Sequence, residues 1–461
     1  MRFSRFSLLA ACLAFLVPQI QARSAEVAPA EPSDKAGIED VDIGDYELLL
    51  LPQVDLAREQ QLDERRVSNG NTAHFAAVLE VGSDPWTVGT WSVEPPELDG
   101  RLAGASPGVM ARWRLRIHSP GALSLSLAFR RFALPAGARL ELGTADGRFE
   151  VDPFTRADQD EHGQLWTPPI PGDDLLLDLS LPVAKLDELA LELWRVHHGY
   201  AGFGDSAASK AGDCHVDPAC LDAPEWTAYS RAVGLVAIEG VRFCTGFLIN
   251  NTAQDGRPLF ATAAHCGLKS SNAASVVVMW DFERPSCDRP ATRPESRYFQ
   301  SGARLLALHR GADMALLELD DRPDPSLGLV YLGWDRSDSD PLEAVTIHHP
   351  GTSRKRISVA RGPLYSTSHL DRRQRPGANH LFVPSWQRGT TEGGSSGAPL
   401  LGPDGRVVGT LHGGYAACGN REGDWFGRLS AAWWGPGPSL RLRDWLDPED
   451  SQAIVLDPLV P

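Results

Sequence analysis

The chain has 461 residues, 42% of them apolar, and a formal net charge of -16. A chain of this length can bury more than one core, so we expect two folded units and some additional segments. No run of Lys and Arg is longer than the three residues Arg354, Lys355 and Arg356. A protein that binds a nucleic-acid backbone needs a larger basic surface, so nucleic acid is excluded as an expected partner.

The chain begins with the pattern of a signal peptide, which we place at residues 1–22. Arg2 and Arg5 precede an apolar stretch from Phe6 to Val17, and Ala22 offers a small residue at the cleavage site. This stretch is far shorter than the roughly 20 residues that span a bilayer, so we expect export and no membrane anchor. Cys12 resembles the acylated cysteine of a bacterial lipoprotein signal, but the apolar stretch continues past it, which favours secretion.

The region after the signal peptide divides into a lead-in, a β domain and a linker. Residues 23 to about 70 are rich in Ala, Glu, Asp and Pro without periodicity, which predicts a flexible lead-in. From about 75 to 200, apolar residues alternate with polar or small ones between Gly and Pro clusters, which predicts a small antiparallel β-sandwich. Residues 199–213 are small and polar and predict an exposed linker. The alternating residues are Leu123, Leu125, Leu127, Phe129, Leu175, Leu177, Leu179 and Leu181.

Residues 211–461 predict a second, mostly β domain, because short apolar runs alternate with Gly, Pro and Asp. Near its end, residues 439–446 have partly helical spacing and stop before Pro448, which predicts a short terminal helix. The apolar runs are Leu235–Ile238, Phe243–Ile249, Val276–Trp280, Leu316–Leu319 and Val407–Leu411.

Six of the seven cysteines lie in this second domain, and an even number in an exported chain predicts disulfides. The spacings include no Cys-x-x-Cys pair, so we expect no metal site. Six cysteines allow 15 pairings, and spacing alone does not choose among them. They are Cys214, Cys220, Cys244, Cys266, Cys287 and Cys418.

Three short segments of the second domain carry the groups that hydrolysis of a peptide bond needs. His265 ends an apolar run directly before Cys266, whose disulfide can fix it in place, and is the candidate general base. Asp313 heads an apolar strand and is the candidate that orients the imidazole. Ser396 lies in a glycine-rich turn and is the candidate nucleophile, and the N–H groups of Gly394 and Ser396 are the candidate oxyanion donors.

Each of these segments has an ordinary structural explanation when it is taken alone. A Gly-Ser-Ser-Gly turn is usually a loop, a single histidine is usually packed or solvated, and an aspartate before a strand often caps it. Their order, His then Asp then Ser, on an exported and mostly β domain predicts a serine endopeptidase. Such hydrolysis needs no cofactor, and the sequence has no cofactor motif or phosphate loop, so we expect none.

The second domain resembles the chymotrypsin-like serine peptidases, and most closely the bacterial lysyl endopeptidases. The resemblance covers residues 211–461 and extends to blocks outside the three segments above. It implies an all-β fold in which a chymotrypsin-like double β-barrel follows a β-sandwich-like propeptide domain. The blocks are Arg231–Gly234, Leu248–Thr252, Leu332–Arg336, Ile347–Pro350, Lys355–Ser358, Leu411–Gly414 and Asp444–Pro448.

The resemblance also implies a residue that sets specificity. Trypsin-like enzymes carry a carboxylate six residues before the nucleophile, but that position is Thr390 here. The matching residue of the lysyl endopeptidases is Asp424, which we expect to bind a substrate lysine, with Glu392 as the alternative acid. A short pocket around a buried carboxylate would favour a compact ammonium over a guanidinium.

Other implied features concern the surroundings of the active site. His412 is expected near the triad, backed in the family by a tryptophan that residues 366–380 do not contain. Ser395 replaces the aspartate that pairs with the new N-terminus in chymotrypsin-type zymogens, so activation needs another device. The implied disulfides are Cys214–Cys418, Cys220–Cys287 and Cys244–Cys266.

We therefore expect a secreted zymogen with a signal peptide (1–22), a propeptide (23–210) and a peptidase domain (211–461). Lys210, in the linker, is the expected processing site, which would make Ala211 the mature N-terminus. The expected partners are protein or peptide substrates and the protein's own propeptide, and the expected state is a monomer. The alternatives are a same-fold peptidase with arginine or mixed basic preference, and an inactive homologue that acts as a binding module.

Overall fold

The computed structural model describes residues 45–68, 72–81, 86–87, 92–94, 108–202, 214–221, 223–287 and 298–461. The chain divides into the units Met1–Asp40 and Val41–Pro461, and every described residue belongs to the second unit. The predicted signal peptide and the predicted processing site at Lys210 and Ala211 lie outside the described residues. Below, residues 45–202 are called the N-terminal domain and residues 214–461 the C-terminal domain.

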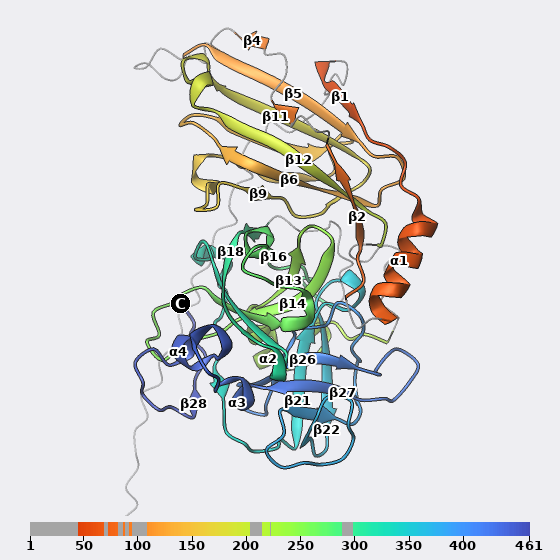
Figure 1. The fold of residues 1–461 in the computed structure, drawn as a ribbon, viewed down its shortest axis with the longest axis vertical. Helices are drawn as coiled ribbons and strands as arrows, with labels where there is room; N and C mark the ends of the chain where they lie inside the picture. The colour runs from red at the N-terminus through yellow and green to blue at the C-terminus, as the bar shows by residue number, and fades with distance from the viewer. Residues whose placement is uncertain are drawn as a thin grey trace, which may run out of the picture. The chain divides into compact units, whose positions relative to one another are not determined.

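The N-terminal domain consists of two six-stranded sheets (Figure 1). In the first, the main strand order is β1-β5-β11-β7-β8 and β4 pairs with β5; in the second it is β10-β6-β12-β2, with β9 on β6 and β3 on β12. The strands are β1 (Glu47–Leu50), β2 (Ala76–Glu80), β3 (Trp86–Thr87), β4 (Ser92–Glu94), β5 (Met110–His118), β6 (Ser124–Ala133), β7 (Arg139–Thr144), β8 (Glu150–Phe154), β9 (Leu165–Trp166), β10 (Ile170–Pro171), β11 (Asp174–Pro182) and β12 (Ala190–Gly199).

The predicted β-sandwich is confirmed, because one core of buried apolar side chains comes from both sheets. On β5, burial alternates strictly, so Trp113, Leu115 and Ile117 point into the core while arginines between them pair with Asp178 and Asp174 of β11. Period-two alternation of this kind is what a strand with one buried face requires.

The segment expected to be a flexible lead-in differs from that prediction, because it contains β1 and the helix α1 (Leu56–Ser68). Strand β1 pairs in parallel with β5, and Asp55 accepts a hydrogen bond from the backbone of Arg58 at the start of the helix. Helix α1 has no buried residue, so it lacks the apolar periodicity on which the prediction relied. Its good helix formers and the arginines of its last turn are the signals that remained.

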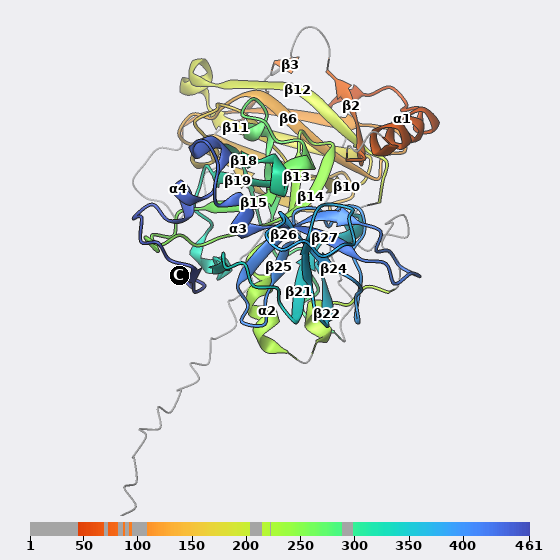
Figure 2. The same cartoon turned by 60° about the horizontal axis from the view of Figure 1, so that its bottom comes forward.

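The C-terminal domain also consists of two sheets, in line with the predicted chymotrypsin-like double barrel (Figure 2). The first has seven strands in the order β17-β16-β13-β14-β15-β19-β18, and the second has nine, with the main order β22-β21-β25-β26-β27-β24-β23. The strands are β13 (Val233–Ile238), β14 (Arg242–Leu248), β15 (Leu259–Ala263), β16 (Val277–Met279), β17 (Phe299–Ser301), β18 (Ala303–His309), β19 (Met314–Leu319), β20 (Trp334–Asp335), β21 (Glu343–His348), β22 (Arg356–Arg361), β23 (Tyr365–Thr367), β24 (His380–Val383), β25 (Pro399–Leu401), β26 (Val407–Gly414), β27 (Asp424–Arg428) and β28 (Val455–Leu456).

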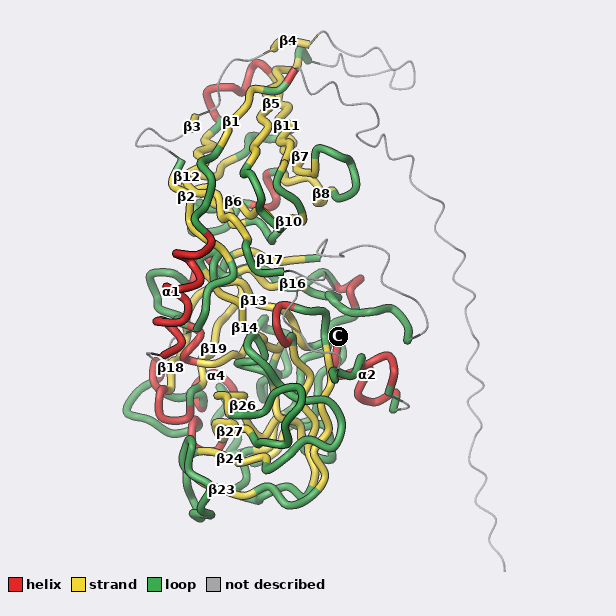
Figure 3. The backbone as a smooth tube through the Cα atoms, turned by 90° about the vertical axis from the view of Figure 1, so that its right-hand side faces the viewer, coloured by secondary structure: helices red, strands yellow, loops and turns green. Residues whose placement is uncertain are grey.

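Helices contribute little to the described structure, as the tube in Figure 3 shows. The α-helices of the C-terminal domain are α2 (Pro224–Ser230), α3 (Leu429–Ala432) and α4 (Arg443–Leu446). The single helix predicted at residues 439–446 is instead the 3-10 turn Pro438–Leu440 followed by α4, because Arg441 is extended (φ -151, ψ 156). Among the described residues, no helix is long and apolar enough to cross a membrane.

The three disulfides implied by the family resemblance are confirmed. Cys214 bonds to Cys418, Cys220 to Cys287 and Cys244 to Cys266. All three lie within the C-terminal domain, and two of them hold the segment that opens this domain against distant parts of the chain.

Candidate active site

His265 is positioned by the end of strand β15. The strand leads directly into the 3-10 turn Ala264–Cys266, and Cys266 is tied by its disulfide to Cys244 on β14. The backbone N–H of His265 donates to Asp313 Oδ1 (2.9 Å). The histidine is therefore held from the adjacent strand on one side and by the aspartate on the other.

Asp313 lies immediately before strand β19, which pairs with β15 so that Ala263 faces Met314. The next residue, Ala264, donates its N–H to the Asp313 carbonyl (3.1 Å), which brings His265, one position further, close to Asp313. Asp313 has a positive φ of 49° at the end of the 3-10 turn Arg310–Ala312, and its side chain is 5% exposed. Its burial makes it an acceptor that water does not compete for.

Ser396 lies in the turn between two glycines with positive φ, Gly394 (94°) and Gly397 (87°). A side chain at Gly397 would place Cβ 2.2 Å from the Thr245 carbonyl oxygen, so only glycine allows this close approach. Among the described residues, the backbone N–H groups of Gly394 and Ser396 donate no hydrogen bond within the protein. Two free donors next to a serine hydroxyl are the arrangement that an oxyanion hole requires.

The three side chains form one hydrogen-bonded series. His265 Nδ1 lies 2.6 Å from Asp313 Oδ2, and His265 Nε2 lies 2.9 Å from Ser396 Oγ. With Nδ1–H fixed by the carboxylate, Nε2 presents a lone pair that is able to accept the serine proton. The three residues that the sequence singled out are thus brought together in a geometry that suits acyl transfer.

The turn that carries Ser396 is supported by a buried network that sequence reasoning missed. Ser358 Oγ donates to the Thr390 carbonyl (2.9 Å), so it accepts from His348 Nε2 (3.0 Å). Burial lowers the pKa of His348 well below its ordinary value, so the ring is neutral and its Nδ1 accepts from Ser395 Oγ (2.8 Å). Ser395 Oγ in turn accepts from the backbone N–H of Glu392 (3.2 Å).

Asp424, the expected specificity residue, is buried at the start of β27 and is 1% exposed. Its Oδ2 accepts hydrogen bonds from Trp386 Nε1 (2.7 Å) and Thr391 Oγ1 (2.6 Å). A Cβ at Gly414 would lie 2.4 Å from Asp424 Oδ1, so the missing side chain at Gly414 leaves that oxygen its space. Burial raises the pKa of Asp424 and these hydrogen bonds oppose the rise. Thr391 links this carboxylate to the Ser396 turn five residues further along.

Glu392, the alternative specificity acid, has a different set of contacts. One of its oxygens lies 3.0 Å from His215 Nε2, and the other accepts from the backbone N–H of Cys418 (3.3 Å). It therefore connects the Ser396 turn to the opening segment of the C-terminal domain. These contacts leave Asp424 as the better candidate for binding a substrate side chain.

His412 on β26 lies beside the triad as expected, and its ring is stacked on His265 with centroids 5.4 Å apart. Residues 366–380 contain no tryptophan, and it is His369 from this segment that stacks on His412, with ring centroids 3.5 Å apart. His380 Nε2 lies 2.9 Å from His412 Nδ1. The signal for both partners was present in the sequence, since the segment without tryptophan contains these two histidines.

The hydrogen bonds around His412 assign its tautomer. Asn379 donates through its amide nitrogen to Gly311, so its Oδ1 accepts from His380 Nδ1 (2.9 Å). Burial lowers the pKa of His380 to about 4, so this ring is neutral and its Nε2 accepts a hydrogen bond from His412 Nδ1–H. Burial also lowers the pKa of His412 to about 3, and its Nε2, 3.7 Å from Asp313 Oδ2, carries a lone pair. His265 therefore remains the imidazole donor to Asp313.

Two groups of side chains at this end of the molecule have the spacing of metal ligands. The ligand atoms of His265, Asp313 and His412 lie within 4.8 Å of one another, but the first two are already hydrogen-bonded to each other. Cys214, His215 and Cys418 form the second group, in which the two cysteines are joined in a disulfide. In each group two of the three residues already bond to each other, so we assign a metal site to neither.

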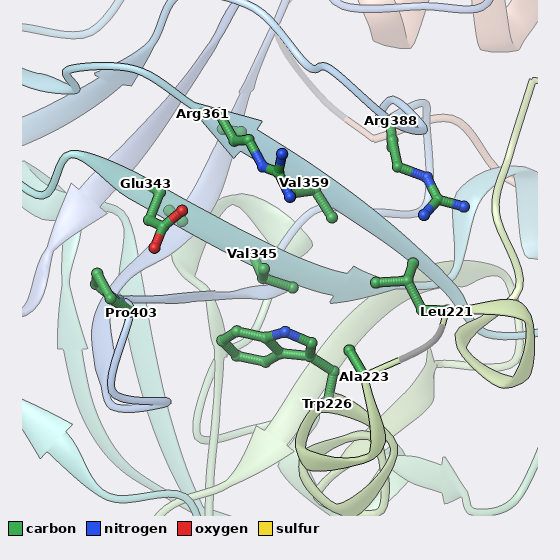
Figure 4. A pocket seen from close by; sticks show the side chains of 12 residues that line it. Leu221, Ala223, Trp226, Glu343, Val345, Val359, Arg361, Arg388 and Pro403 are labelled. Atoms are coloured by element: carbon green, nitrogen blue, oxygen red, sulfur yellow. The ribbon is translucent and has the colours of Figure 1, made fainter.

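A separate pocket of about 350 Å³ lies against strands β21 and β22 and helix α2 (Figure 4). Trp226, Val345 and Val359 supply apolar walls, and Arg361 and Arg388 lie beside them. None of His265, Asp313, Ser396 or Asp424 is among its lining residues. The pocket is thus distinct from the group of residues around Ser396.

The sequence of the chain is similar to that of known lysyl endopeptidases. Residues 208–427 match the family model described as lysyl endopeptidase, C-terminal domain. A lysyl endopeptidase from Pseudomonas aeruginosa is 29% identical over 359 residues, which cover 69% of this chain and 73% of that relative. The alignment is longer than the C-terminal domain alone, so it includes part of the N-terminal region.

Solved structures of serine proteases also show likeness to part of the chain. The active form of the protease Rv3671c from M. tuberculosis is 20% identical with a TM-score of 0.32, over 46% of this chain and 83% of that one. The thermostable serine protease AL20 from an extremophilic microorganism is 14% identical with a TM-score of 0.31, over 44% and 92% of the two chains. From the family model and the curated relative, together with a serine whose hydroxyl faces a carboxylate-oriented imidazole, we conclude that the chain is a lysyl endopeptidase-like protein, a serine endopeptidase.

Proposed function

We propose that the protein is the secreted zymogen of an endopeptidase that cleaves after lysine. In this proposal Ser396 attacks the scissile carbonyl, His265 accepts its proton and later donates it to the leaving amine, and Asp313 orients the ring. The N–H groups of Gly394 and Ser396 bind the oxyanion. The distances given above support these roles, and this chemistry uses no bound cofactor.

The observation that carries the lysine specificity is the state of Asp424. It is a buried carboxylate, and among the residues that the structure describes no Lys, Arg or His forms an ion pair with it. A buried charge without an oppositely charged partner is costly, and the hydrogen bonds from Thr391, Trp386 and the Ala416 backbone offset this cost only in part. A substrate ammonium would supply the missing charge, which makes Asp424 a binding site for a cationic side chain.

We propose lysine rather than arginine because hydrogen bonds already occupy one carboxylate oxygen of Asp424, which leaves the other oxygen for the substrate. Its Oδ2 already accepts from Trp386 and Thr391, so a guanidinium would not find both oxygens free for a bidentate pair. An ammonium is a compact point charge and needs only one oxygen. The remaining oxygen, Oδ1, lies beside Gly414, where a Cβ would come within 2.4 Å of it.

The specificity is tested by digesting a denatured protein and mapping every new terminus by mass spectrometry. Wild type should cut after lysine, and Ser396→Ala should reduce cleavage by about 10⁴-fold or more. Asp424→Asn should lower kcat/KM for lysine peptides by about 10²- to 10³-fold, since one partner of a buried charge pair is lost. Glu392→Gln is the matched control and should retain lysine cleavage. Cuts after arginine by wild type would replace the lysine proposal by mixed basic specificity.

Contacts between the two domains support the zymogen part of the proposal. Thr72 donates to the backbone carbonyl of His265 (3.2 Å), and Thr352, next to the residue that hydrogen-bonds Gly393, donates to Gly202. Phe75 stacks on Phe243 at 3.7 Å and its N–H donates to Val241. The N-terminal domain thus contacts the backbone of the general base itself.

Release of the N-terminal domain would follow cleavage of the segment that joins it to the C-terminal domain. That segment contains Lys210, which a lysine-cutting enzyme would recognise in its own chain. N-terminal sequencing of the secreted protein tests this, with Ala211 as the expected first residue and an unprocessed Ser396→Ala form as the control. Export is tested in the same experiment by comparing the culture medium with the cell fraction. A processed form that begins elsewhere would contradict the assignment of Lys210.

A further inference from the structure

Glu161, His162 and Asp320 form a group of potential ligands at a contact between the two domains. One atom from each residue lies within 4.8 Å of the others. Glu161 and His162 lie in the turn before β9 of the N-terminal domain, whereas Asp320 directly follows β19 of the C-terminal domain. Residues far apart in the sequence are therefore brought together, and none of them takes part in the proposed catalysis.

Two atoms of this group are buried and lie next to each other. The side chain of Asp320 is only 8% exposed, and its Oδ2 makes no hydrogen bond. His162 Nε2 is also shielded from solvent and makes no hydrogen bond, although it lies 3.3 Å from Asp320 Oδ2. Among the described residues, the polar contact of each atom is with the other, at a separation longer than an ordinary hydrogen bond, so a ligand shared by both could improve on it.

A third carboxylate, that of Asp160, approaches the same position. Its Oδ1 accepts from the backbone N–H of His162 (2.9 Å), which fixes the turn. A Cβ at Gly302 would lie 2.1 Å from Asp320 Oδ2 and 2.9 Å from Asp160 Oδ2. The two carboxylates from different domains therefore converge on a place that only a glycine leaves open.

The group carries an excess of negative charge. Among the residues that the structure describes, no Lys or Arg forms an ion pair with Asp160, Glu161 or Asp320, and His162 is the single basic side chain in contact. Burial, with Asp160 and Glu161 as further contributors, raises the pKa of Asp320 to about 6, while His162 opposes the rise. Burial also raises the pKa of Asp160.

We propose that Glu161, His162 and Asp320 bind a zinc ion that joins the N-terminal domain to the C-terminal domain. In a tetrahedral site with bonds of about 2.0 Å, two ligand atoms lie about 3.3 Å apart. This matches the separation of His162 Nε2 and Asp320 Oδ2. Glu161 is exposed and free to turn its carboxylate toward the ion, and water or Asp160 completes the coordination.

The chemistry of the donors favours zinc over calcium or magnesium. Ca²⁺ and Mg²⁺ take oxygen ligands, whereas an imidazole nitrogen beside carboxylates suits Zn²⁺. A zinc ion would also neutralise the excess charge at the contact. If the N-terminal domain is the propeptide, as the proposed function states, the ion would delay its release; the binding itself does not depend on that proposal.

The test is calorimetric titration of zinc chloride into the metal-stripped, full-length Ser396→Ala protein, which does not cleave itself. The chain also carries His412→Gln, which removes the histidine group beside the triad as a competing site. One zinc per chain is expected, and His162→Gln or Asp320→Asn should weaken its binding by about 100-fold or more. CaCl₂ in place of zinc should give no comparable heat.

His118→Gln is the matched control, because His118 also lies in the N-terminal domain beside a carboxylate, with Nδ1 3.7 Å from Asp174 Oδ2. It should leave zinc binding unchanged. Zinc should also raise the melting temperature of the parent protein but not that of the His162 variant, which tests the site even where a variant is less stable. Equal zinc binding by the parent and both ligand variants would overturn the proposal, as would the absence of zinc binding by the parent.

Discussion

Ser395→Ala is the perturbation that best tests how the Ser396 turn is held. In chymotrypsin-type zymogens an aspartate at this position awaits a new N-terminus, whereas here Ser395 joins a finished network through His348. Removing the hydroxyl leaves His348 Nδ1 without its donor and the Glu392 N–H without its acceptor. Because His348 is fully buried, no water replaces the lost partner.

The expected loss of stability is about 2 to 4 kcal/mol, since each unsatisfied buried group costs about 1–3 kcal/mol and the Glu392 N–H is only partly buried. For a domain of this size the melting temperature should fall by about 5 to 15 °C. The measurement is calorimetry of the C-terminal-domain transition in the inactive Ser396→Ala background. In the active chain, kcat/KM should fall by about 10- to 100-fold, because the oxyanion donors lose their alignment.

Ser385→Ala is the control, since Ser385 makes only a long, exposed hydrogen bond (3.4 Å) with Gln387. It should change stability by no more than about 0.5 kcal/mol. If Ser395→Ala behaved like this control in both stability and activity, the network would not be what holds the turn.

Three further predictions concern the rest of the molecule. Burial lowers the pKa of His197 to about 3, so between pH 6.5 and 3 the unfolded chain binds more protons than the folded chain. The free energy of unfolding should therefore fall as the pH drops through this window. Urea titrations at several pH values should show that His197→Gln reduces this dependence by about 1.4 kcal/mol per pH unit. Replacing Cys244 and Cys266 by serine should lower the free energy of unfolding by about 3 kcal/mol, because the disulfide closes a loop with a sequence separation of 22 residues. An unchanged midpoint of urea unfolding would contradict this. Gly427→Ala would place Cβ 1.7 Å from the Ala312 carbonyl oxygen, so soluble yield and activity should collapse, whereas an active, soluble variant would show that the strand shifts freely.

His265, Asp313 and Ser396 could be singled out from the sequence because each lies in a local pattern that indicates its own surroundings. The glycines around Ser396, the cysteine after His265 and the strand after Asp313 are all neighbours in sequence. The pairing of β15 with β19 brings His265 and Asp313 together. Ser396 precedes β25 of the other sheet and is joined to the first sheet by the hydrogen bond from the Thr245 N–H to its carbonyl (2.8 Å), which the sequence did not predict. The fold class followed from the same alternation.

The supporting residues were not predictable in the same way, because their partners come from distant segments. His348 meets Ser395 and Ser358 across the sheet, and nothing near it in sequence indicates a buried network. The same applies to Asp320, whose neighbours His162 and Glu161 belong to another domain. Helix α1 was missed for a different reason, since a helix without a buried face leaves no periodic signal.

The placement of the cysteines has a consequence for the proposed maturation. Every disulfide lies beyond residue 213, and the sole cysteine before that point is Cys12. If the linker is cut as proposed, no covalent bond would join the two domains, and an intramolecular contact would become a bimolecular one. The fraction of free enzyme would then depend on concentration, so dilution outside the cell would itself shift the equilibrium toward activity.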